Sequence, residues 1–124
     1  MNQAYLVDTN IILWAWHEPH RVPQRILDLL GTDAEFHASV ATIWEISIKT
    51  ALGKLDTVNN VADALISTGY RILPIEIEHA EAARQLPLHH RDPFDRMLIV
   101  QAQIESLTMV TTDQSFSAYD LAIA

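Results

Sequence analysis

The sequence contains no cysteine. Without cysteine the chain can form neither a disulfide framework nor a thiolate zinc site, and this absence suits a reducing compartment. Any metal ion must then be held by carboxylates or histidines. The N-terminal residues also lack a basic region, and Asp8 and Asn10 interrupt the apolar stretch that follows. Neither a signal peptide nor a membrane span is therefore expected, and we predict a cytoplasmic protein.

Positive charge is scarce as well, since eight basic residues face sixteen acids and the formal net charge is -8 at pH 7. This balance argues against a broad phosphate-binding surface of the kind that gives tight, non-specific binding of nucleic acid. It does not exclude a nuclease. Two divalent cations held by four of the acids would offset half of the charge, and the basic residues need only line that site.

The chain alternates short apolar segments with helical patterns, and it has no internal repeat or long linker. We therefore predict one domain over residues 1–124, with a parallel sheet that helices cover on both faces. Strands are expected at residues 3–8, 35–39, 70–75 and 107–113, with 119–124 as a short fifth strand at one edge. Helices are expected after residue 10, over 23–30, 42–52 and 61–68, from about 78 to 86, and from Pro93 onward.

Four acids stand where a strand leads into a helix. Asp8 and Asp113 end the first and fourth strands, and Glu45 and Asp95 fall in the first turns of two helices. Because ligands of open parallel sheets bind beyond the carboxyl ends of the strands, we expect these four side chains to converge on one edge.

Each acid also has a purely structural explanation. In "RDPFD", Asp92 fits a helix N-cap, Pro93 the first helical position, and Asp95 the positive end of the helix dipole. In "TIWE", Thr42 and Glu45 fit a capping box. The remaining alternatives are a pair between Glu45 and Lys49 and Asx-turns at Asp8 and Asp113.

Taken together, four crowded carboxylates repel one another, and burying them without partners is costly. Such a cluster therefore needs cations. Hard divalent ions with oxygen ligands fit best, which means magnesium or manganese rather than zinc. These ions are suited to phosphoryl chemistry.

The segments "LVDTN", "WEISIKTALGKL", "LPLHHRDPFDRMLIVQA" and "MVTTD" resemble the PIN-domain family, and most of all the VapC-type toxins of bacterial toxin-antitoxin modules. The resemblance covers nearly the whole chain and implies a metal-dependent ribonuclease with a three-layer α/β/α sandwich, usually dimeric and silenced by a small antitoxin. The family's acidic positions map onto Asp8, Glu45, Asp95 and Asp113, and Thr9 fits the polar position beside the first acid. Relatives often finish in a strand with a large aromatic residue, whereas this chain ends "LAIA", which leaves the fifth strand open.

Basic residues near the acids have two readings each. His89, His90 and Arg91 could contact RNA phosphate together with Arg96, or they could form a solvated loop. Lys49 could neutralise a phosphate or pair with Glu45. The apolar residues are assigned to the core, or in the case of the tryptophans to the core or a subunit contact rather than to base stacking: Trp14, Trp16, Trp44, Met97, Leu98 and Ile99.

The sequence thus predicts a ribonuclease that uses Mg²⁺, or Mn²⁺ in its place, to hydrolyse RNA phosphodiester bonds. Its expected partners are RNA, an antitoxin and a second copy of the chain; by the resemblance, the products would carry 5′-phosphate and 3′-hydroxyl ends. One alternative is a magnesium-dependent phosphoacceptor with Asp8 as nucleophile, which would need a lysine at a later strand end, where the sequence has none. Another is a binding module that has kept the site and lost turnover.

Overall fold

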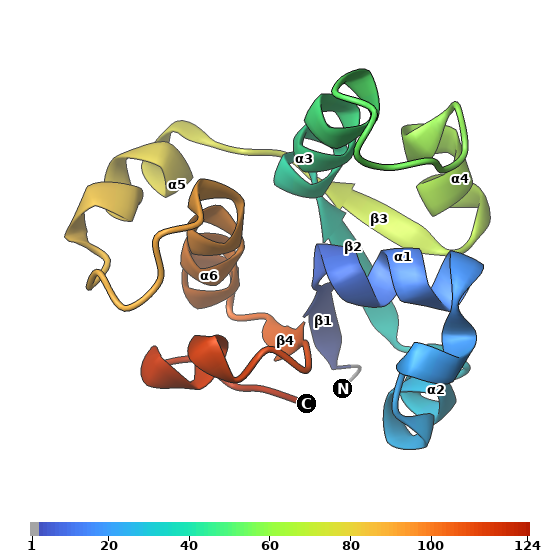
Figure 1. Cartoon of the computed structure of the whole chain (residues 1–124). Coiled ribbons are helices and arrows are strands. Elements are labelled where there is room, and N and C mark those ends of the chain that lie inside the picture. The colour runs from blue at the N-terminus through green and yellow to red at the C-terminus, as the bar shows by residue number, and fades with distance from the viewer. Residues whose placement is uncertain (1–2) are drawn as a thin grey trace.

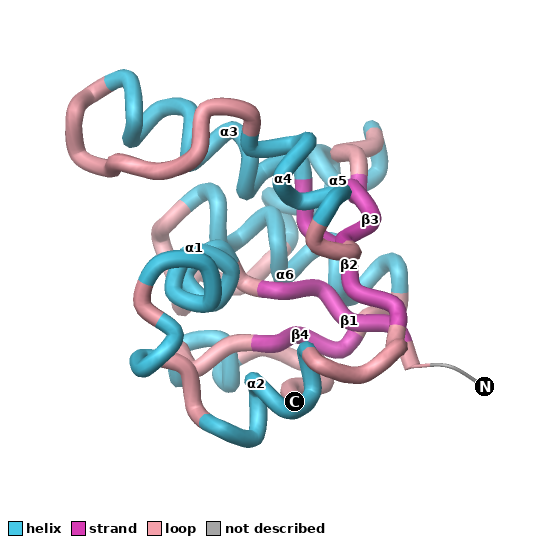
Figure 2. Tube along the Cα trace, turned by 90° about the vertical axis from the view of Figure 1, so that its right-hand side faces the viewer, coloured by secondary structure: helices cyan, strands magenta, loops and turns pink. Residues whose placement is uncertain are grey.

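The computed structural model describes residues 3–124, whose strands form one parallel sheet in the order β3-β2-β1-β4. The strands in this part of the chain are β1 (Ala4–Val7), β2 (Glu35–Ser39), β3 (Tyr70–Leu73) and β4 (Thr108–Val110). Figure 2 shows them side by side in that order. All four lie where strands were predicted, although β4 ends at Val110 rather than at residue 113.

Helices cover both faces of the sheet. Within residues 3–124 they are α1 (Thr9–His17), α2 (Gln24–Leu30), α3 (Val40–Ala51), α4 (Val61–Ser67), α5 (Ile77–Ala82) and α6 (Pro93–Glu105). In Figure 1, α5 and α6 lie on one side of the strands, and α1, α2 and α4 lie on the other. The predicted three-layer α/β/α sandwich is thus confirmed. None of the helices in this described part of the chain is long and apolar enough to cross a membrane.

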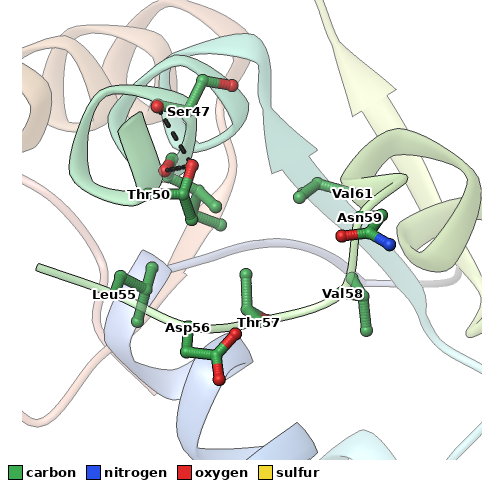
Figure 3. A pocket seen from close by; sticks show the side chains of 9 residues that line it. Ser47, Thr50, Leu55, Asp56, Thr57, Val58, Asn59 and Val61 are labelled. Carbon is green, nitrogen blue, oxygen red and sulfur yellow. Dashed lines mark hydrogen bonds between the residues drawn. The ribbon is translucent and has the colours of Figure 1, made fainter. Parts of the chain in front are cut away.

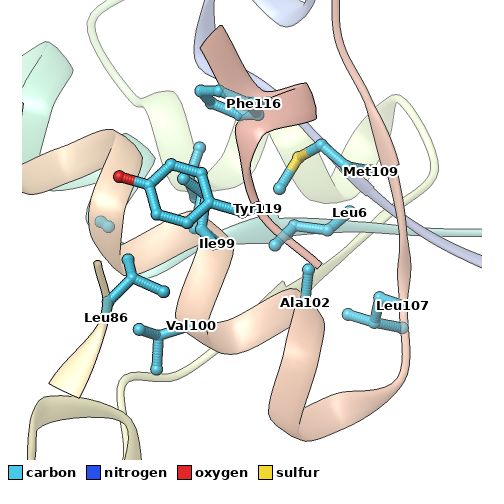
Figure 4. Close-up of a cluster of buried hydrophobic side chains, with 11 residues drawn as sticks. Leu6, Leu86, Ile99, Val100, Ala102, Leu107, Met109, Phe116 and Tyr119 are labelled. Carbon is cyan, nitrogen blue, oxygen red and sulfur yellow. The ribbon is translucent and has the colours of Figure 1, made fainter. Parts of the chain in front are cut away.

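Side chains alternate between the two faces of β1, and this alternation divides the core into two clusters. Tyr5 and Val7 belong to the cluster that includes Ile11 of α1, whereas Leu6 belongs to the cluster that includes Leu98 of α6. Because both faces of β1 are buried, this strand lies at the centre of the sheet, between β2 and β4. Figure 4 shows the second cluster, whose labelled members include Leu6, Leu86, Ile99, Val100, Met109, Phe116 and Tyr119.

The C-terminal segment forms much less of a fifth strand than residues 119–124 would allow. Only Ile123 pairs with β4, in a single parallel bridge to Met109. The Met109 N–H donates to the Ala122 carbonyl at 2.8 Å, and the Ala124 N–H donates to the Met109 carbonyl at 2.9 Å. The segment before this bridge is a 3-10 helix, η3 (Gln114–Ala118), which sends Phe116 into the core.

Two further expectations about helix starts need correction. Helix α3 begins at Val40 with Ser39 as its N-cap, because the Ser39 hydroxyl accepts a hydrogen bond from the Ala41 N–H at 2.9 Å. The predicted capping box of Thr42 and Glu45 is therefore wrong, and Glu45 lies in the second turn rather than the first. Helix α2 likewise begins one residue after Pro23, which serves as its N-cap. Asn60 is the N-cap residue of α4, but its side chain makes no capping hydrogen bond.

The core assignments hold for five of the six apolar residues. Leu98 and Ile99 are fully buried, and Trp14, Trp16 and Met97 are partly buried against the two clusters. Trp44 is different, because 57% of it is exposed and its ring makes an edge contact with Phe94. Trp44 therefore lies outside the core, and the subunit contact given as its alternative stays a prediction.

Candidate metal centre

Asp8 follows β1 directly and is almost completely buried, with 4% of its surface exposed. Its N–H donates to the Val110 carbonyl of β4 at 3.0 Å, and its Oδ2 accepts a hydrogen bond from the Thr111 hydroxyl at 2.8 Å. Burial raises the pKa of Asp8 to about 6, the Thr111 bond opposes this rise, and the charges of Glu45 and Asp113 add to it. The carboxyl group therefore sits among other acids with one fixed orientation.

Glu45 points into the same region from the second turn of α3. Its residue exposure is only 5%, and its Oε2 accepts from Lys49 Nζ at 2.7 Å, as the sequence spacing suggested. Its other oxygen, Oε1, is buried and has no hydrogen-bond partner among residues 3–124. A buried carboxylate oxygen without a partner is costly, and a cation is the partner that its charge calls for.

Asp92 and Asp95 divide two tasks at the start of α6. Asp92 is the N-cap, since its Oδ1 accepts from the N–H groups of Phe94 at 2.8 Å and of Asp95 at 3.1 Å, which confirms the predicted cap. The carboxyl group of Asp95 faces the other acids instead. Burial, as the largest cause, and then the charges of Asp8, Asp92, Glu45 and Asp113, in that order, together raise its pKa to about 8.

Asp113 caps η3 and also reaches the acidic group. Its Oδ1 accepts from the Ser115 N–H at 3.0 Å and from the Ser115 hydroxyl at 2.7 Å, so the Asx-turn expected for this residue is present. Partial burial raises the pKa of Asp113, but the two Ser115 bonds and nearby His90 outweigh this effect and hold the pKa below its ordinary value. Asp113 therefore stays ionised at pH values at which Asp8 and Asp95 are partly protonated.

The four acids named from the sequence thus influence one another electrostatically, as convergence on one sheet edge requires. We call Asp8, Glu45, Asp95 and Asp113 the acidic cluster. Its donors are carboxylate oxygens, one of which is orphaned, and two of its members bind protons unusually well. A hard divalent cation would supply the missing partner and displace those protons, so the residues present fit such an ion.

His90, which the sequence analysis placed near the acids as a possible RNA contact, lies at this cluster. Its Nε2 is 2.9 Å from Asp95 Oδ2 and 3.8 Å from Asp113 Oδ2, and one atom from each of the three residues could hold a metal ion jointly. The ring Nδ1 accepts from the Asp92 N–H at 3.3 Å. Because an accepting Nδ1 carries no proton, the neutral ring carries it on Nε2, where it faces the carboxylates and would have to leave before Nε2 could bind a metal ion. Within residues 3–124, Nε2 makes no hydrogen bond of good geometry.

Arg96 differs from its predicted role as an RNA contact. Its guanidinium donates to four backbone carbonyls at 2.9–3.1 Å, namely those of Ala83, Leu86, Pro87 and His90. These bonds use the side chain to hold residues 83–90 against α6. The phosphate-contact hypothesis for Arg96 is therefore replaced by a structural role, and through the His90 carbonyl this role extends to the acidic cluster.

Tyr119 holds the same segment from the other side, a role that no sequence pattern indicated. Its hydroxyl accepts from the His90 N–H at 2.7 Å and donates to the Pro87 carbonyl at 2.9 Å. The His89 ring packs edge-on against the Tyr119 ring, while Arg91 is exposed. Hydrogen bonds thus hold the loop before α6 in place at His90, whereas Arg91 is exposed to solvent.

Thr9 supports the site from within the fold rather than from its surface. It is 3% exposed, and its hydroxyl shares a 2.8 Å hydrogen bond with the Thr42 hydroxyl. This bond joins the first turns of α1 and α3, the two helices that follow Asp8 and contain Glu45. Thr42 of α3, which does not have its expected capping role, is therefore a hydrogen-bond partner of Thr9 of α1.

Comparison with known proteins identifies a family and several similar folds. A family model of the PIN domain matches residues 5–121. The fold is similar to the crystal structure of VapBC2 from Rickettsia felis bound to promoter DNA, with a TM-score of 0.76, 17% identity and 98% of each chain covered. It is also similar to FitAcB from Neisseria gonorrhoeae, with a TM-score of 0.69, 23% identity and 96% and 95% of the two chains covered.

A third similar structure is that of DNA-bound VapBC from Salmonella typhimurium, with a TM-score of 0.70, 19% identity and 100% and 98% of the two chains covered. No curated protein matches the chain in sequence. At these identities the structures bear on the fold alone, but the family model spans the segment from β1 to the end of η3 and beyond, including all four acids. The chain belongs to the PIN-domain family.

Proposed function

We propose that this chain is a metal-dependent endoribonuclease that acts as the VapC-type toxin of a toxin-antitoxin module. One observation carries the proposal: Glu45 Oε1 is buried without a partner beside Asp8 and Asp95, whose pKa values are raised to about 6 and about 8. Carboxylates that are this crowded are arranged for a cation rather than for stability.

In this proposal Asp8, Glu45, Asp95 and Asp113 hold one or two Mg²⁺ ions, for which Mn²⁺ can substitute. A bound ion of this kind activates water and offsets charge at the attacked phosphate. The chain's own residues orient the ligands. The Thr111 hydroxyl fixes Asp8 Oδ2, Lys49 fixes Glu45 Oε2, and the His90 ring faces Asp95. Thr9 supports the site by joining α1 to α3.

A phosphoacceptor with Asp8 as nucleophile is less well supported. Asp8 is 4% exposed, and burial raises its pKa, which leaves fewer carboxylates ready to attack a phosphoryl group. Neither of the chain's two lysines follows β3 or β4. Incubation with acetyl phosphate and Mg²⁺ followed by mass spectrometry should leave the chain unmodified; a phosphoryl adduct on Asp8 would favour this alternative.

The proposed partners are RNA, a small cognate antitoxin and a second copy of the chain, all within the cytoplasm. The antitoxin would place an arginine or lysine near Asp8 and Asp95, where a cation relieves carboxylate repulsion. Three apolar side chains support the dimer, because Trp44 and Ile48 of α3 and Leu52, its C-cap, are exposed at helical spacing. Sedimentation of the purified chain should give the mass of a dimer, and co-expression with its genomic neighbour should recover a complex.

The function is tested by RNA cleavage with the matched pair Asp8→Asn and Asp63→Asn. Asp63 is an exposed residue of α4, so its substitution changes the same charge away from the site. Wild type and Asp63→Asn should cleave RNA with Mg²⁺ or Mn²⁺ and arrest growth when expressed, and both effects should be lost in Asp8→Asn. Undiminished cleavage in excess EDTA would contradict a metal mechanism.

A further inference from the structure

A cavity of about 310 Å³ lies between α1 and the segment that follows α3. Its wall includes Asn10, Trp14, Arg21, Lys49 and Lys54. Two of these residues connect it to the acidic cluster. Asn10 comes two positions after Asp8, and Lys49 Nζ lies 2.7 Å from Glu45 Oε2. A ligand in this cavity would therefore lie beside the site of proposed cleavage.

The turn at the end of α3 brings the two lysines together. Gly53 has φ +73°, a conformation that favours glycine, and its N–H donates to the Thr50 carbonyl at 3.1 Å. The Lys54 N–H then donates back to the Lys49 carbonyl at 2.9 Å. This pair of bonds is the Schellman arrangement that ends many helices. It places both lysines at the same end of α3, where Lys49 contacts Glu45 of the acidic cluster.

This cavity differs from the rest of the chain in the basic residues that line it. The chain has only two lysines, and both line it, together with Arg21. Arg21 stacks on the Trp14 ring at 4.3 Å and pairs with Glu18, whereas Lys54 has no salt bridge among residues 3–124. The cavity is lined by these three cations and by two acids, Glu18 and Asp56, so its lining is less acidic than the chain as a whole, whose net charge is -8.

A neighbouring cavity provides a contrast. The segment from Leu55 to Val58 also lines a cavity of about 250 Å³ (Figure 3), which includes Asp56 but no lysine or arginine within residues 3–124. Leu55 and Asp56 border both cavities. Among residues 3–124, lysine and arginine thus line the cavity that adjoins the acidic cluster and do not line its neighbour. The positive charge is therefore associated with the proposed cleavage site and not with the segment that borders both cavities.

We propose that the cavity between α1 and Lys54 binds a phosphodiester of single-stranded RNA next to the one that is cleaved. Lys54 contacts the phosphate as an unpaired cation, and Lys49 lies between this phosphate and Glu45. Asn10 offers amide donors and an acceptor to the adjoining sugar or base. Glu18 and Asp56 also line the cavity. Because their negative charges repel phosphate, we expect the cavity to accept a single phosphate group. This assignment rests on the proposed ribonuclease activity and specifies where its substrate lies.

The test compares Lys54→Gln with Arg84→Gln. Both substitutions remove one positive charge from an exposed residue, but Arg84 lies in the 3-10 helix Ala83–Gln85, outside the cavity. With Mg²⁺ and an unstructured RNA, Lys54→Gln should raise KM roughly 3- to 10-fold and leave kcat within about twofold, because the lost contact is not made to the reacting group. Arg84→Gln should match wild type in both. Equal melting temperatures would show that the fold is retained.

A binding measurement separates the outcomes further. In EDTA, fluorescence anisotropy with a labelled single-stranded RNA should show weaker binding by Lys54→Gln and a salt slope shallower by about 0.7, the value expected for one phosphate contact. If wild type neither binds nor cleaves RNA, the proposed function fails. If wild type cleaves RNA and Lys54→Gln has an unchanged KM and slope, only this inference fails. Weakened capture of a co-expressed protein partner with unchanged RNA binding would assign the cavity to that partner and overturn it.

Discussion

The imidazole Nε2 of His90 lies 2.9 Å from Oδ2 of Asp95, five residues further along the chain. Two backbone bonds fix this relationship, since the His90 N–H donates to Tyr119 and its carbonyl accepts from Arg96. A ring held in this way can orient the Asp95 carboxylate toward a bound cation, as groups behind metal ligands commonly do.

We therefore predict that His90→Ala weakens Mg²⁺ binding roughly 10- to 100-fold, the usual range for partners of metal ligands. His90→Gln should lose less, because its amide N–H can still reach the carboxylate. Isothermal calorimetry with Mg²⁺ measures this directly, and His89→Ala, which changes the exposed neighbouring histidine, is the control. Identical Mg²⁺ affinities for His90→Ala and His89→Ala would rule out the orienting role.

The second prediction separates Asp92 from Asp95. Asp92→Asn should keep both stability and cleavage, because an amide oxygen also accepts the two N–H bonds, whereas Asp92→Ala should lose about 1 kcal/mol of unfolding free energy. Asp95→Asn should melt near or above wild type without metal, yet bind Mg²⁺ poorly and cleave orders of magnitude more slowly. Melting temperatures with and without Mg²⁺, together with cleavage rates, test this. If Asp92→Asn abolished cleavage while Asp95→Asn cleaved at the wild-type rate, our assignment of cap and ligand would be reversed.

The third prediction concerns pH in the presence of chelator. The folded state raises the pKa of Asp8 to about 6 and of Asp95 to about 8, so between about pH 4 and pH 8 the folded chain binds more protons than the unfolded chain. The stability that these two groups contribute is complete below about pH 4 and is lost as the pH rises through the two folded pKa values.

Urea denaturation at several pH values would measure this loss as the difference between wild type and the Asp8→Asn, Asp95→Asn double variant, since other groups titrate alike in both. Wild type should become the less stable of the two as the pH rises, and Mg²⁺ should restore it. A difference that stays constant from about pH 4 to pH 9 would show that the two carboxyl groups titrate as they do in the unfolded chain.

The fourth prediction concerns the loop before α6. Arg96→Lys replaces a forked guanidinium by a single ammonium group, which cannot reach four carbonyls at once. At about 1 kcal/mol for each net hydrogen bond, the loss of two or three should cost about 2 to 3 kcal/mol of unfolding free energy. Hydrogen exchange should accelerate over residues 83–92. Arg91→Lys, at an exposed neighbouring position, should leave both measurements unchanged.

The location of the acidic cluster could be predicted because it depends on a rule of topology. Strand ends of a parallel sheet meet at one edge, so Asp8 and Asp113 could be paired from their positions after two apolar strands. Asp92 could be assigned as a cap for a similar reason, since the Asp-Pro dipeptide before a helical pattern is a local signal.

Features that depend on competition between neighbours could not be predicted. Ser39 and Thr42 both suit an N-cap, and only the end of β2 decides that the chain turns at Ser39. The clamp made by Arg96 depends on the path of a loop whose carbonyls carry no sequence signature. The reduction of the expected fifth strand to one bridge also depends on tertiary contacts. Tyr119 is buried in the core, and Ile123 is the residue of this segment that pairs with β4.

The hydrogen bond from Thr111 to Asp8 joins residues that are 103 positions apart. The central strand β1 is synthesised before its partner β4, and pairings over such separations form late. Until Thr111 and Asp113 have been synthesised, Asp8 lacks both of them, and the acidic cluster cannot assemble. For the proposed nuclease, this order of synthesis would delay activity until the strand that precedes Asp113 has been made and has paired with β1.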